Sequence, residues 1–360
     1  MRREDPLILG AGPAGCAAAI VLARGGAEPV LLDRNAEAGD ALCGGFLSWR
    51  TSARLARLGI DIAALGGHPA RTLALFAGQD SARAPLPGVA YGLSRHTLDT
   101  AMREAAVAAG AKLEIDTVRE VEGRTVTTKS REWLPDTLFL ASGKHDVRGA
   151  ARPRSKDNPA LGLRIRIPAS PALAETVGDA IELHLFEQGY AGIVLQEDGS
   201  ANICLALRKE RLAQADADPH ELLAQVAARH PAFALRLQGD WRTLPVDTVG
   251  SVPYGWIAQD TAEGVFRLGD QAAVIPSLAG EGMAIAVASG VSAAETWLRG
   301  GAGAARSWQS GFARRAARPV KAAKAAWTLA EHPALARLAL PLARIVPSLL
   351  RPAMRMTRID

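Results

Sequence analysis

The sequence predicts an α/β fold in which a domain with a parallel sheet is interleaved with an antiparallel sheet and followed by C-terminal helices. Three observations support this prediction: a strand–turn–helix–strand pattern at the start of the chain, β-rich stretches in the middle, and a glycine-rich turn ahead of an Ala-rich helix near residue 280. The chain has 360 residues, 48% of them hydrophobic and 22% charged. This length is sufficient for one large domain or two interleaved ones.

The first pattern spans residues 7–33. Apolar runs at 7–9 and 30–32 flank a helix-favouring segment at 16–24, which is the order of a βαβ unit. In a parallel crossover, the turn after the first strand lies at the mouth of the sheet. The following helix there offers unpaired N–H groups and the positive end of its dipole. The pattern therefore predicts a phosphate-binding turn.

Each glycine of this turn has an expected task. Gly10 makes the tight turn, Gly12 lets the backbone approach a pyrophosphate, and Gly15 lets the helix pack closely on the strand. Asp33 ends the second strand 18 positions after Gly15, where a carboxylate can accept hydrogen bonds from ribose hydroxyls. The complete unit predicts a Rossmann-type dinucleotide site, but it does not distinguish NAD from FAD.

Later motifs point to a flavin. They are Gly12-Pro13-Ala14-Gly15, Asp33-Arg34, Cys43-Gly44-Gly45, Arg95-His96-Thr97-Leu98-Asp99, and the run from Phe266 to Ala273 followed by Pro276 and Gly280-Glu281-Gly282-Met283. In this order the chain resembles the flavoprotein superfamily that contains para-hydroxybenzoate hydroxylase-like monooxygenases and geranylgeranyl reductases. The resemblance extends from about residue 7 to residue 290 and implies a Rossmann-type FAD-binding domain.

The resemblance also implies the FAD contacts. Asp270 contacts the ribityl or pyrophosphate region, the turn at Gly280–Gly282 lies beside the isoalloxazine, and Arg95, at the start of an expected helix at 97–109, contacts the cofactor. A helix N-terminus after that turn can stabilise negative charge on reduced flavin. The full set is Gly10, Gly12, Pro13, Ala14, Gly15, Asp33, Arg34, Cys43, Gly44, Arg95, Gly143, Gly269, Asp270, Pro276, Gly280, Gly282 and Met283.

The middle of the chain predicts an antiparallel sheet. Stretches at 161–168, 181–186, 191–196 and 201–207 are β-rich, and Glu197-Asp198-Gly199 between the last two is a hairpin signal. The resemblance implies that this sheet covers the flavin ring and lines the substrate cavity. We expect substrate contacts from Tyr190, Trp241, Tyr254 and Trp256, with hydrophobic packing as the alternative.

These elements divide the chain into six segments. The predicted FAD-binding parts are residues 1–70, 96–155 and 256–300. Residues 71–95 are an excursion toward the substrate domain, 156–255 form the antiparallel substrate-binding domain, and 301–360 form a basic helical region.

Three functions remain open. The first is hydroxylation of an aromatic or polyketide-like lipophilic molecule by a flavin monooxygenase. The second is reduction of isoprenoid double bonds, and the third is a peripheral membrane flavin-binding role without catalysis. The resemblance suggests an Asp-Gly motif serving NADPH near residue 142, but the chain has Ser142-Gly143-Lys144-His145 there. The electron donor is therefore NAD(P)H or a separate reductase.

No catalytic arrangement is evident in the sequence. Cys43, His145, Tyr254 and Trp256 are weak catalytic candidates, with a buried cysteine, a solvated histidine and packed aromatic rings as the alternatives. Catalysis would rest mainly on the cofactor and its enclosure. The three cysteines show neither a disulfide framework nor metal-ligand spacing, so no metal is expected.

The positive charge is concentrated in the last sixty residues. Residues 301–360 carry eleven Lys or Arg and two acids, a net of +9 against +5 for the whole chain. These cations alternate with apolar residues, and Pro341, Pro347 and Pro352 divide the segment, so contact with an anionic membrane surface is one expectation and packed helices the other. Nucleic acid binding is not expected. No basic stretch followed by an apolar run opens the chain, so we expect a cytoplasmic protein, peripheral at the inner face of the membrane if the tail binds lipid.

Overall fold

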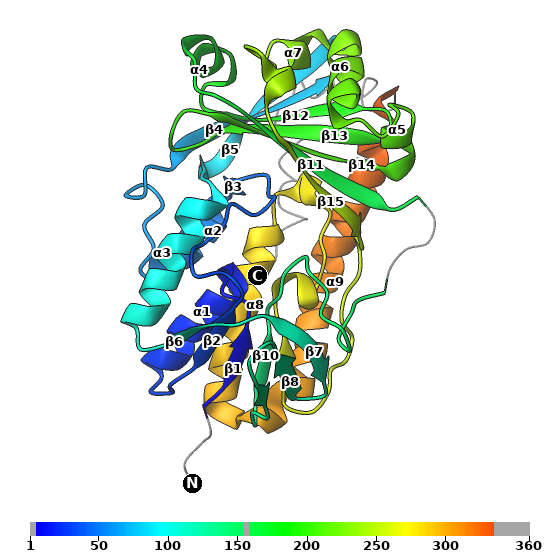
Figure 1. The fold of residues 1–360 in the computed structure, drawn as a ribbon. Helices are drawn as coiled ribbons and strands as arrows, with labels where there is room; N and C mark the ends of the chain where they lie inside the picture. The colour runs from blue at the N-terminus through cyan, green and yellow to red at the C-terminus, as the bar shows by residue number, and fades with distance from the viewer. Residues whose placement is uncertain (1–4, 154–157, 335–360) are drawn as a thin grey trace.

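The computed structural model describes residues 5–153 and 158–334, and the chain passes repeatedly between two sheet regions (Figure 1). The first region is a five-stranded sheet whose paired strands are all parallel, in the order β16-β10-β1-β2-β6. Its strands are β1 (Leu7–Leu9), β2 (Val30–Asp33), β6 (Lys112–Ile115), β10 (Leu138–Leu140) and β16 (Val265–Arg267). Because they come from widely separated parts of the chain, the Rossmann-type domain is assembled from several segments, as the sequence predicts.

Helix α1 (Pro13–Arg24) packs against both α3 (Arg95–Ala108) and α8 (Gly282–Gly300) beside this sheet. The contact between α1 and α8 is close, because a Cβ added at Gly290 would lie 2.3 Å from the carbonyl oxygen of Ala14. Helix α2 (Trp49–Arg57) also packs on α8. The apolar faces of these helices form one core with Phe139 and Phe266 of the sheet.

The second region is an eight-stranded sheet in the order β15-β11-β14-β13-β12-β4-β5-β3. Its strands are β3 (Phe46–Leu47), β4 (His68–Ala77), β5 (Asp80–Gly92), β11 (Ala160–Ile167), β12 (Ala180–Phe186), β13 (Gly189–Leu195), β14 (Ala201–Arg208) and β15 (Val246–Val252). The predicted hairpin joins β13 to β14, with Gly199 at a φ of +76°.

The expectation of a purely antiparallel sheet is wrong at one position. Strands β4 and β12 pair in parallel, from Ala180 opposite Thr72 to Leu185 opposite Ala77, so the sheet is mixed. The two strands are about 100 residues apart in the chain, which visits the parallel-sheet domain between them, so no tight turn forces them into opposite directions. Strands β3 and β4 also begin before residue 71, so the excursion from the first domain starts earlier than the sequence suggested.

Short helices cover the outer face of the eight-stranded sheet, at the top of Figure 1. They are α4 (Pro171–Val177), α5 (Lys209–Ala213), α6 (Pro219–Arg229) and α7 (Pro231–Ala234). A small antiparallel sheet of β7 (Val118–Glu122), β8 (Thr125–Thr128) and β9 (Glu132–Trp133) lies at the opposite end of the molecule.

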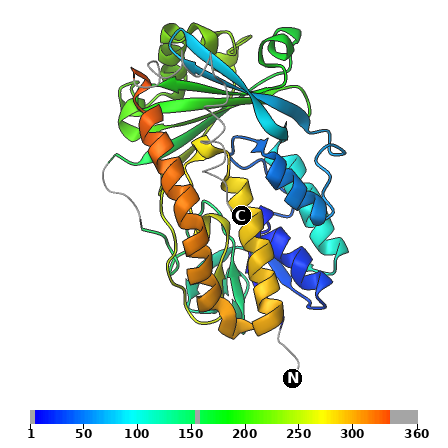
Figure 2. The same cartoon turned by 180° about the vertical axis from the view of Figure 1, so that it is seen from behind.

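Helix α9 (Ala305–Ala330) runs along the back of the molecule and contacts both regions (Figure 2). Near its start Trp308 packs on Phe266 of β16, and near its end Trp327 packs on Tyr190 of β13. At 26 residues the helix is about 39 Å long, enough to brace the two regions against each other. The predicted interfacial pieces around Pro341, Pro347 and Pro352 lie outside the described residues.

Candidate active site

One large cavity lies between the two sheet regions. Its volume is about 1170 Å³, and residues from both sheets, from the turns before α1 and α8, and from the end of α9 line it. Pockets that hold a single small ligand span roughly 300–1,000 Å³. The cavity therefore has room for an extended cofactor and a substrate together.

The turn between β1 and α1 has the geometry that its three glycines predict. Gly10 has a φ of +106°, and a Cβ there would lie 2.5 Å from the carbonyl oxygen of Ala141. A Cβ at Gly15 would lie 2.0 Å from the carbonyl oxygen of Gly10, so this glycine permits the close approach of helix to turn. At Gly12 the nearest atom is 3.6 Å away and belongs to Arg95, so the space above this residue is open to the cavity.

Helices α1 and α8 both begin at the cavity wall. Neither N-terminus has a side-chain cap, so backbone N–H groups and the positive dipole end of each helix are available to an anionic ligand. Gly280 precedes α8 with a φ of +64°, and a Cβ there would strike the ring of Phe46. Two uncapped helix ends facing one cavity suit a cofactor with a pyrophosphate at one point and a ring that gains negative charge at another.

Asp33 and Arg103 hold the first turn in place. One carboxylate oxygen of Asp33 accepts a 2.8 Å hydrogen bond from the N–H of Ala11, and Arg103 lies 3.2 Å from the same oxygen. Arg103 also donates to the carbonyl oxygens of Ala11 at 3.0 Å and Asn35 at 2.9 Å. Arg103 therefore ties the glycine turn to the loop after β2.

Arg95 forms a two-point ion pair with Asp99, with N···O distances of 2.8 and 2.6 Å. Burial alone would lower the pKa of Arg95, but the carboxylate of Asp99 outweighs it and raises the pKa. The guanidinium therefore stays charged while it lines the cavity beside Gly12. A fixed positive charge at this place favours an anionic group over the turn.

The Gly269–Asp270 turn is held in place by Arg152. This buried guanidinium donates to the carbonyl oxygens of Asp270 at 3.1 Å and Lys144 at 2.8 Å, and it pairs with Asp146 at 2.7 Å. The side-chain amide of Gln271 adds a 3.0 Å hydrogen bond to the carbonyl oxygen of Gly143. The loop after β10 and the Gly269–Asp270 turn are thus held together at one wall of the cavity.

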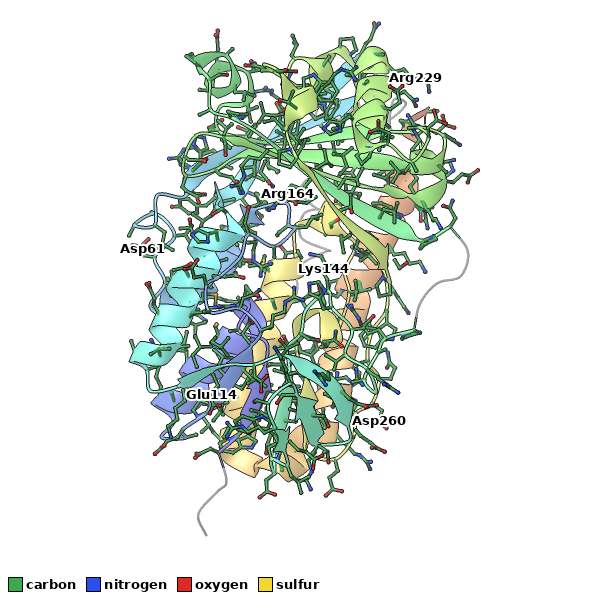
Figure 3. The ribbon with its side chains drawn as sticks, viewed as in Figure 1. Asp61, Glu114, Lys144, Arg164, Arg229 and Asp260 are labelled. Carbon is green, nitrogen blue, oxygen red and sulfur yellow. The ribbon has the colours of Figure 1, made fainter. Side chains whose placement is uncertain are left out.

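A network of ions fixes the loop between β2 and β3 over the same cavity. Arg164 of β11 pairs with Asp40 at 2.9 Å and with Asp247 at 2.5 Å, and Arg166 pairs with Asp40 at 2.6 Å. Lys144 donates to the carbonyl oxygen of Leu42 at 2.8 Å. Figure 3 shows Arg164 and Lys144 in the middle of the molecule, between the upper sheet and the lower domain.

Comparison with known proteins identifies FAD as the cofactor. A family model described as an FAD binding domain matches residues 3–144. The menaquinone reductase of Mycolicibacterium smegmatis is 28% identical over 83% of this chain and 77% of its own length. Digeranylgeranylglycerophospholipid reductase 2 of Methanopyrus kandleri is 27% identical over 81% of this chain and 76% of its own length.

The chain is an FAD-dependent oxidoreductase, and it is similar over most of its length to these two reductases. A flavoprotein/dehydrogenase of Cytophaga hutchinsonii shares the fold, with a TM-score of 0.78 at 15% identity over 97% of this chain and 92% of that one. The open space at Gly12, the two uncapped helices and the charge of Arg95 are the features by which this flavoprotein fits FAD. No described helix is both long and apolar enough to cross a bilayer.

Most of the residues predicted to contact FAD line the cavity of the flavoprotein. These are Gly10, Gly12, Pro13, Ala14, Asp33, Arg34, Cys43, Gly44, Arg95, Gly143, Gly269, Asp270, Gly280, Gly282 and Met283. Gly15 and Pro276 do not line it: Gly15 serves helix packing, and Pro276 is buried at the start of the turn at 277–279.

The predicted substrate residues divide into two pairs. Tyr190 and Tyr254 line the cavity. The prediction for Trp241 is wrong, because this ring lies under α6, where it stacks on His220 and packs on the core of the outer face. Trp256 is also outside the cavity lining, although it is only two positions from Tyr254. Tyr254 and Trp256 are close in the sequence but have different surroundings, because the chain turns at Gly255, which has a φ of +92°.

The remaining catalytic candidates have different surroundings. Cys43 and His145 line the cavity. Burial and then the nearby Arg34 and Lys144 lower the pKa of His145, which keeps the ring neutral near pH 7. Cys204, which the sequence did not single out, also lines the cavity, and burial raises its pKa to about 12, so its thiol stays protonated. Among the described residues, no group of His, Cys, Asp and Glu could hold a metal ion.

Three site residues escaped the sequence reasoning. Arg103 follows Arg95 and Asp99 at four-residue spacing, and that spacing on one helix face was a usable signal. Arg152 comes from an irregular segment and had no such signal. Ser277 follows Pro276 directly, but nothing in the sequence indicated that its hydroxyl would contact Tyr190 and Tyr254.

Proposed function

We propose that this flavoprotein reduces carbon–carbon double bonds of an isoprenoid chain in a lipophilic substrate. The observation that carries the proposal is the apolar character of the cavity on the side of the eight-stranded sheet. Alternate residues of β12, Ile181, Leu183 and Leu185, project into it, and Leu75 of β4 and Val249 of β15 extend the same surface.

Charge is almost absent from this side. Among the described lining residues from the eight-stranded sheet, the turn at 277–279 and α9, none is Lys, Arg or His, and Asp247 is the one acid, held by Arg164. An apolar chain gains about 25 cal/mol for each Å² that it buries in such a surface. The lining therefore favours a long hydrocarbon over a small polar aromatic acid.

The names of the two relatives support the same reaction class. Both are called reductases, and both align with about four-fifths of this chain. Bound FAD would supply the hydride chemistry at the end of the cavity where α8 begins. The protein would contribute the apolar enclosure, the positive helix end and the exclusion of water.

We further propose peripheral attachment to an anionic membrane. Helix α9 carries six basic residues and no acid, and its end lines the cavity at Leu329, which is 57% exposed. A cavity that reaches the surface beside a basic helix would suit a substrate that resides in lipid. The electron donor is proposed to be NAD(P)H or a separate reductase, because Ser142-Gly143-Lys144 lacks the expected aspartate.

The reaction is tested by reducing the bound flavin without oxygen and adding one candidate at a time. Reoxidation by a polyprenyl compound, with a product two mass units heavier for each double bond, is the expected result. If reoxidation requires oxygen, and a phenolic or polyketide-like candidate gains an oxygen atom, the protein is a hydroxylase and the proposal is wrong.

A further inference from the structure

Three hydroxyl groups meet in the apolar half of the cavity. The hydroxyl of Tyr190 donates to Oγ of Ser277 at 2.7 Å, and the hydroxyl of Tyr254 lies 2.8 Å from the same oxygen. Both tyrosine rings pack on Trp327 of α9, within a cluster of leucine and alanine side chains. Most of the other lining residues on this side of the cavity are apolar; Thr248, Asp247 and Cys204 are the exceptions among the described ones from the eight-stranded sheet.

Counting protons shows that this group has one donor to spare. Three hydroxyls carry three protons, and the two links use two of them. Tyr190 is 4% exposed and spends its proton on Ser277. The spare proton therefore belongs to Ser277 or Tyr254, both of which line the cavity.

Ser277 is the better donor of the two. When its oxygen accepts from both tyrosines, its own proton is the one left to point away from them, and a hydroxyl that accepts hydrogen bonds is polarised into a stronger donor. Burial raises the pKa of Tyr190 and of Tyr254, so both phenols remain protonated and can continue to donate to Ser277. Ser277 is exposed at the cavity, so water can accept from this proton when no ligand is bound, and an oxygen atom of a ligand would take the place of that water.

The position of Ser277 in the sequence places its hydroxyl close to the turn that is expected to contact the flavin. Ser277 is three residues before Gly280, in the segment that the family resemblance sets beside the flavin ring. No described Lys, Arg or His lines this part of the cavity, so no described side chain there would neutralise a phosphate. The acceptor should be an uncharged oxygen.

We propose that Ser277, supported by Tyr190 and Tyr254, is the hydrogen-bond donor that anchors a neutral carbonyl or ether oxygen of the isoprenoid substrate beside the flavin-binding turn. This assignment rests on the proposed function. It narrows the substrate class to prenylated molecules whose inserted part carries an uncharged oxygen, and it places prenyl diphosphates outside that class.

The test is a binding titration with the oxidised, FAD-loaded protein, followed by the change in flavin absorbance. The probes are a naphthoquinone with a short isoprenoid side chain and the same prenylated naphthalene without its two oxygens. Ser277→Ala should raise the Kd of the quinone by about twofold to tenfold, the value of one neutral hydrogen bond. The Kd of the naphthalene should stay within about twofold.

Two further variants separate the roles. Ser277→Thr keeps the hydroxyl and should keep the Kd of the quinone, while Tyr254→Phe leaves Ser277 its proton and should raise that Kd less than Ser277→Ala does. Flavin content and melting temperature are measured for each variant. An unchanged quinone Kd in Ser277→Ala would overturn the assignment, as would a loss found in Tyr254→Phe instead, or tight binding of a prenyl diphosphate.

The two proposals fail in different ways. Because the titration needs no turnover, the quinone difference between wild type and Ser277→Ala would persist even if no isoprenoid were ever reduced. If isoprenoids are reduced and Ser277→Ala binds the quinone like wild type, the reductase function stands and the anchor is wrong.

Discussion

Gly10 and Gly12 are two positions apart in one turn, but a methyl group would meet different surroundings at each. At Gly10 it would strike the backbone of Ala141, and the φ of +106° is strained for any L side chain. We expect Gly10→Ala to lower the free energy of unfolding of the FAD-free protein by about 2–5 kcal/mol. At Gly12 the methyl group would meet only the side chain of Arg95, at an ordinary contact distance of 3.6 Å, so Gly12→Ala should leave that free energy nearly unchanged.

We expect Gly12→Ala to change the affinity for FAD instead of the stability of the protein. Gly12→Ala should weaken FAD binding by at least about tenfold, because the methyl group would occupy the place of the pyrophosphate. Denaturant unfolding of the apo-proteins and a fluorescence titration with FAD measure the two effects. If Gly12→Ala bound FAD as tightly as wild type, the pyrophosphate would have to lie elsewhere.

Arg103 provides a second prediction at the scale of one residue. Arg103→Ala removes an ion pair with Asp33 and hydrogen bonds to Ala11 and Asn35. Hydrogen bonds of charged groups contribute about 1.5–3 kcal/mol each, so losing this brace should raise the Kd of FAD roughly tenfold to a hundredfold. The measurement is retention of FAD on dilution, with Arg83→Ala, an exposed arginine outside the cavity lining, as the control. Equal retention in both variants would contradict the assigned role.

The sequence could predict residues whose role is local, but not those whose role depends on tertiary packing. The glycines and Asp33 act within one βαβ unit, so their spacing was informative. Tyr254 and Trp256 differ because Tyr254 reaches Ser277, 23 positions further along the chain, and Trp256 does not. Trp241 lies in a short turn at 241–243, before β15, and packs on the outer face of the sheet, which no local pattern in the sequence indicated.

At the scale of elements, the side chains of β12 point alternately to the two faces of the sheet, and the two faces differ in chemistry. Its odd-numbered residues line the cavity, whereas Glu182 and His184 point to the outer face and are buried under α7. There Arg236 pairs with Glu182 at 2.7 Å, Nε2 of His184 donates a 3.0 Å hydrogen bond to the same carboxylate, and Phe76 stacks on His184. The alternation was readable from the sequence, but the buried ion cluster was not, because Arg236 is 54 positions from Glu182.

The cluster predicts a pH dependence of stability. Burial lowers the pKa of His184, so the folded protein holds the ring neutral while the unfolded chain titrates near the usual value of about 6.5. As pH falls through about 6.5, the unfolded chain takes up a proton that the folded protein does not, and stability declines. His184→Gln keeps a hydrogen bond to Glu182 but cannot titrate, so the decline between pH 7.5 and 5.5 should become smaller.

The measurement is the denaturation midpoint at each pH. His220→Gln, on the partly exposed side of α6, is the control and should show the decline of the wild-type protein. A pH profile of His184→Gln that matches wild type would show that His184 does not cause the decline. The pKa of Glu182 is also lowered: burial opposes this, and hydrogen bonds from His184 and Arg236 outweigh it, so its contribution is lost only at more acidic pH.

At the scale of the whole molecule, α9 joins the two sheet regions and carries the basic face. The fold class followed from the sequence, because the glycine-rich turns and the β-rich stretches had local signals. The cavity between the sheets did not, since it depends on how β3 to β5 and β11 to β15 return to one sheet. That α9 reaches this cavity with Ala326, Leu329 and Ala330 is likewise a property of the assembled molecule.

The basic face of α9 yields the last prediction. Arg318→Glu combined with Lys321→Glu reverses two exposed charges of this helix, whereas Lys209→Glu combined with Arg229→Glu reverses two exposed charges on the outer side of the eight-stranded sheet, where Figure 3 shows Arg229. Each cation near an anionic surface contributes about 1 kcal/mol, so the α9 variant should bind anionic vesicles at least about tenfold more weakly, and the control variant should bind like wild type.

Vesicle sedimentation at two salt concentrations measures both effects. Because screening shortens to roughly 3 Å at 1 M salt, wild-type binding should also weaken there, and vesicles of neutral lipid should retain little protein. If the two variants bind vesicles equally well, or if wild-type binding does not depend on salt, α9 is a packed helix with a solvated basic face. The lipophilic substrate must then reach the cavity without α9 binding to lipid.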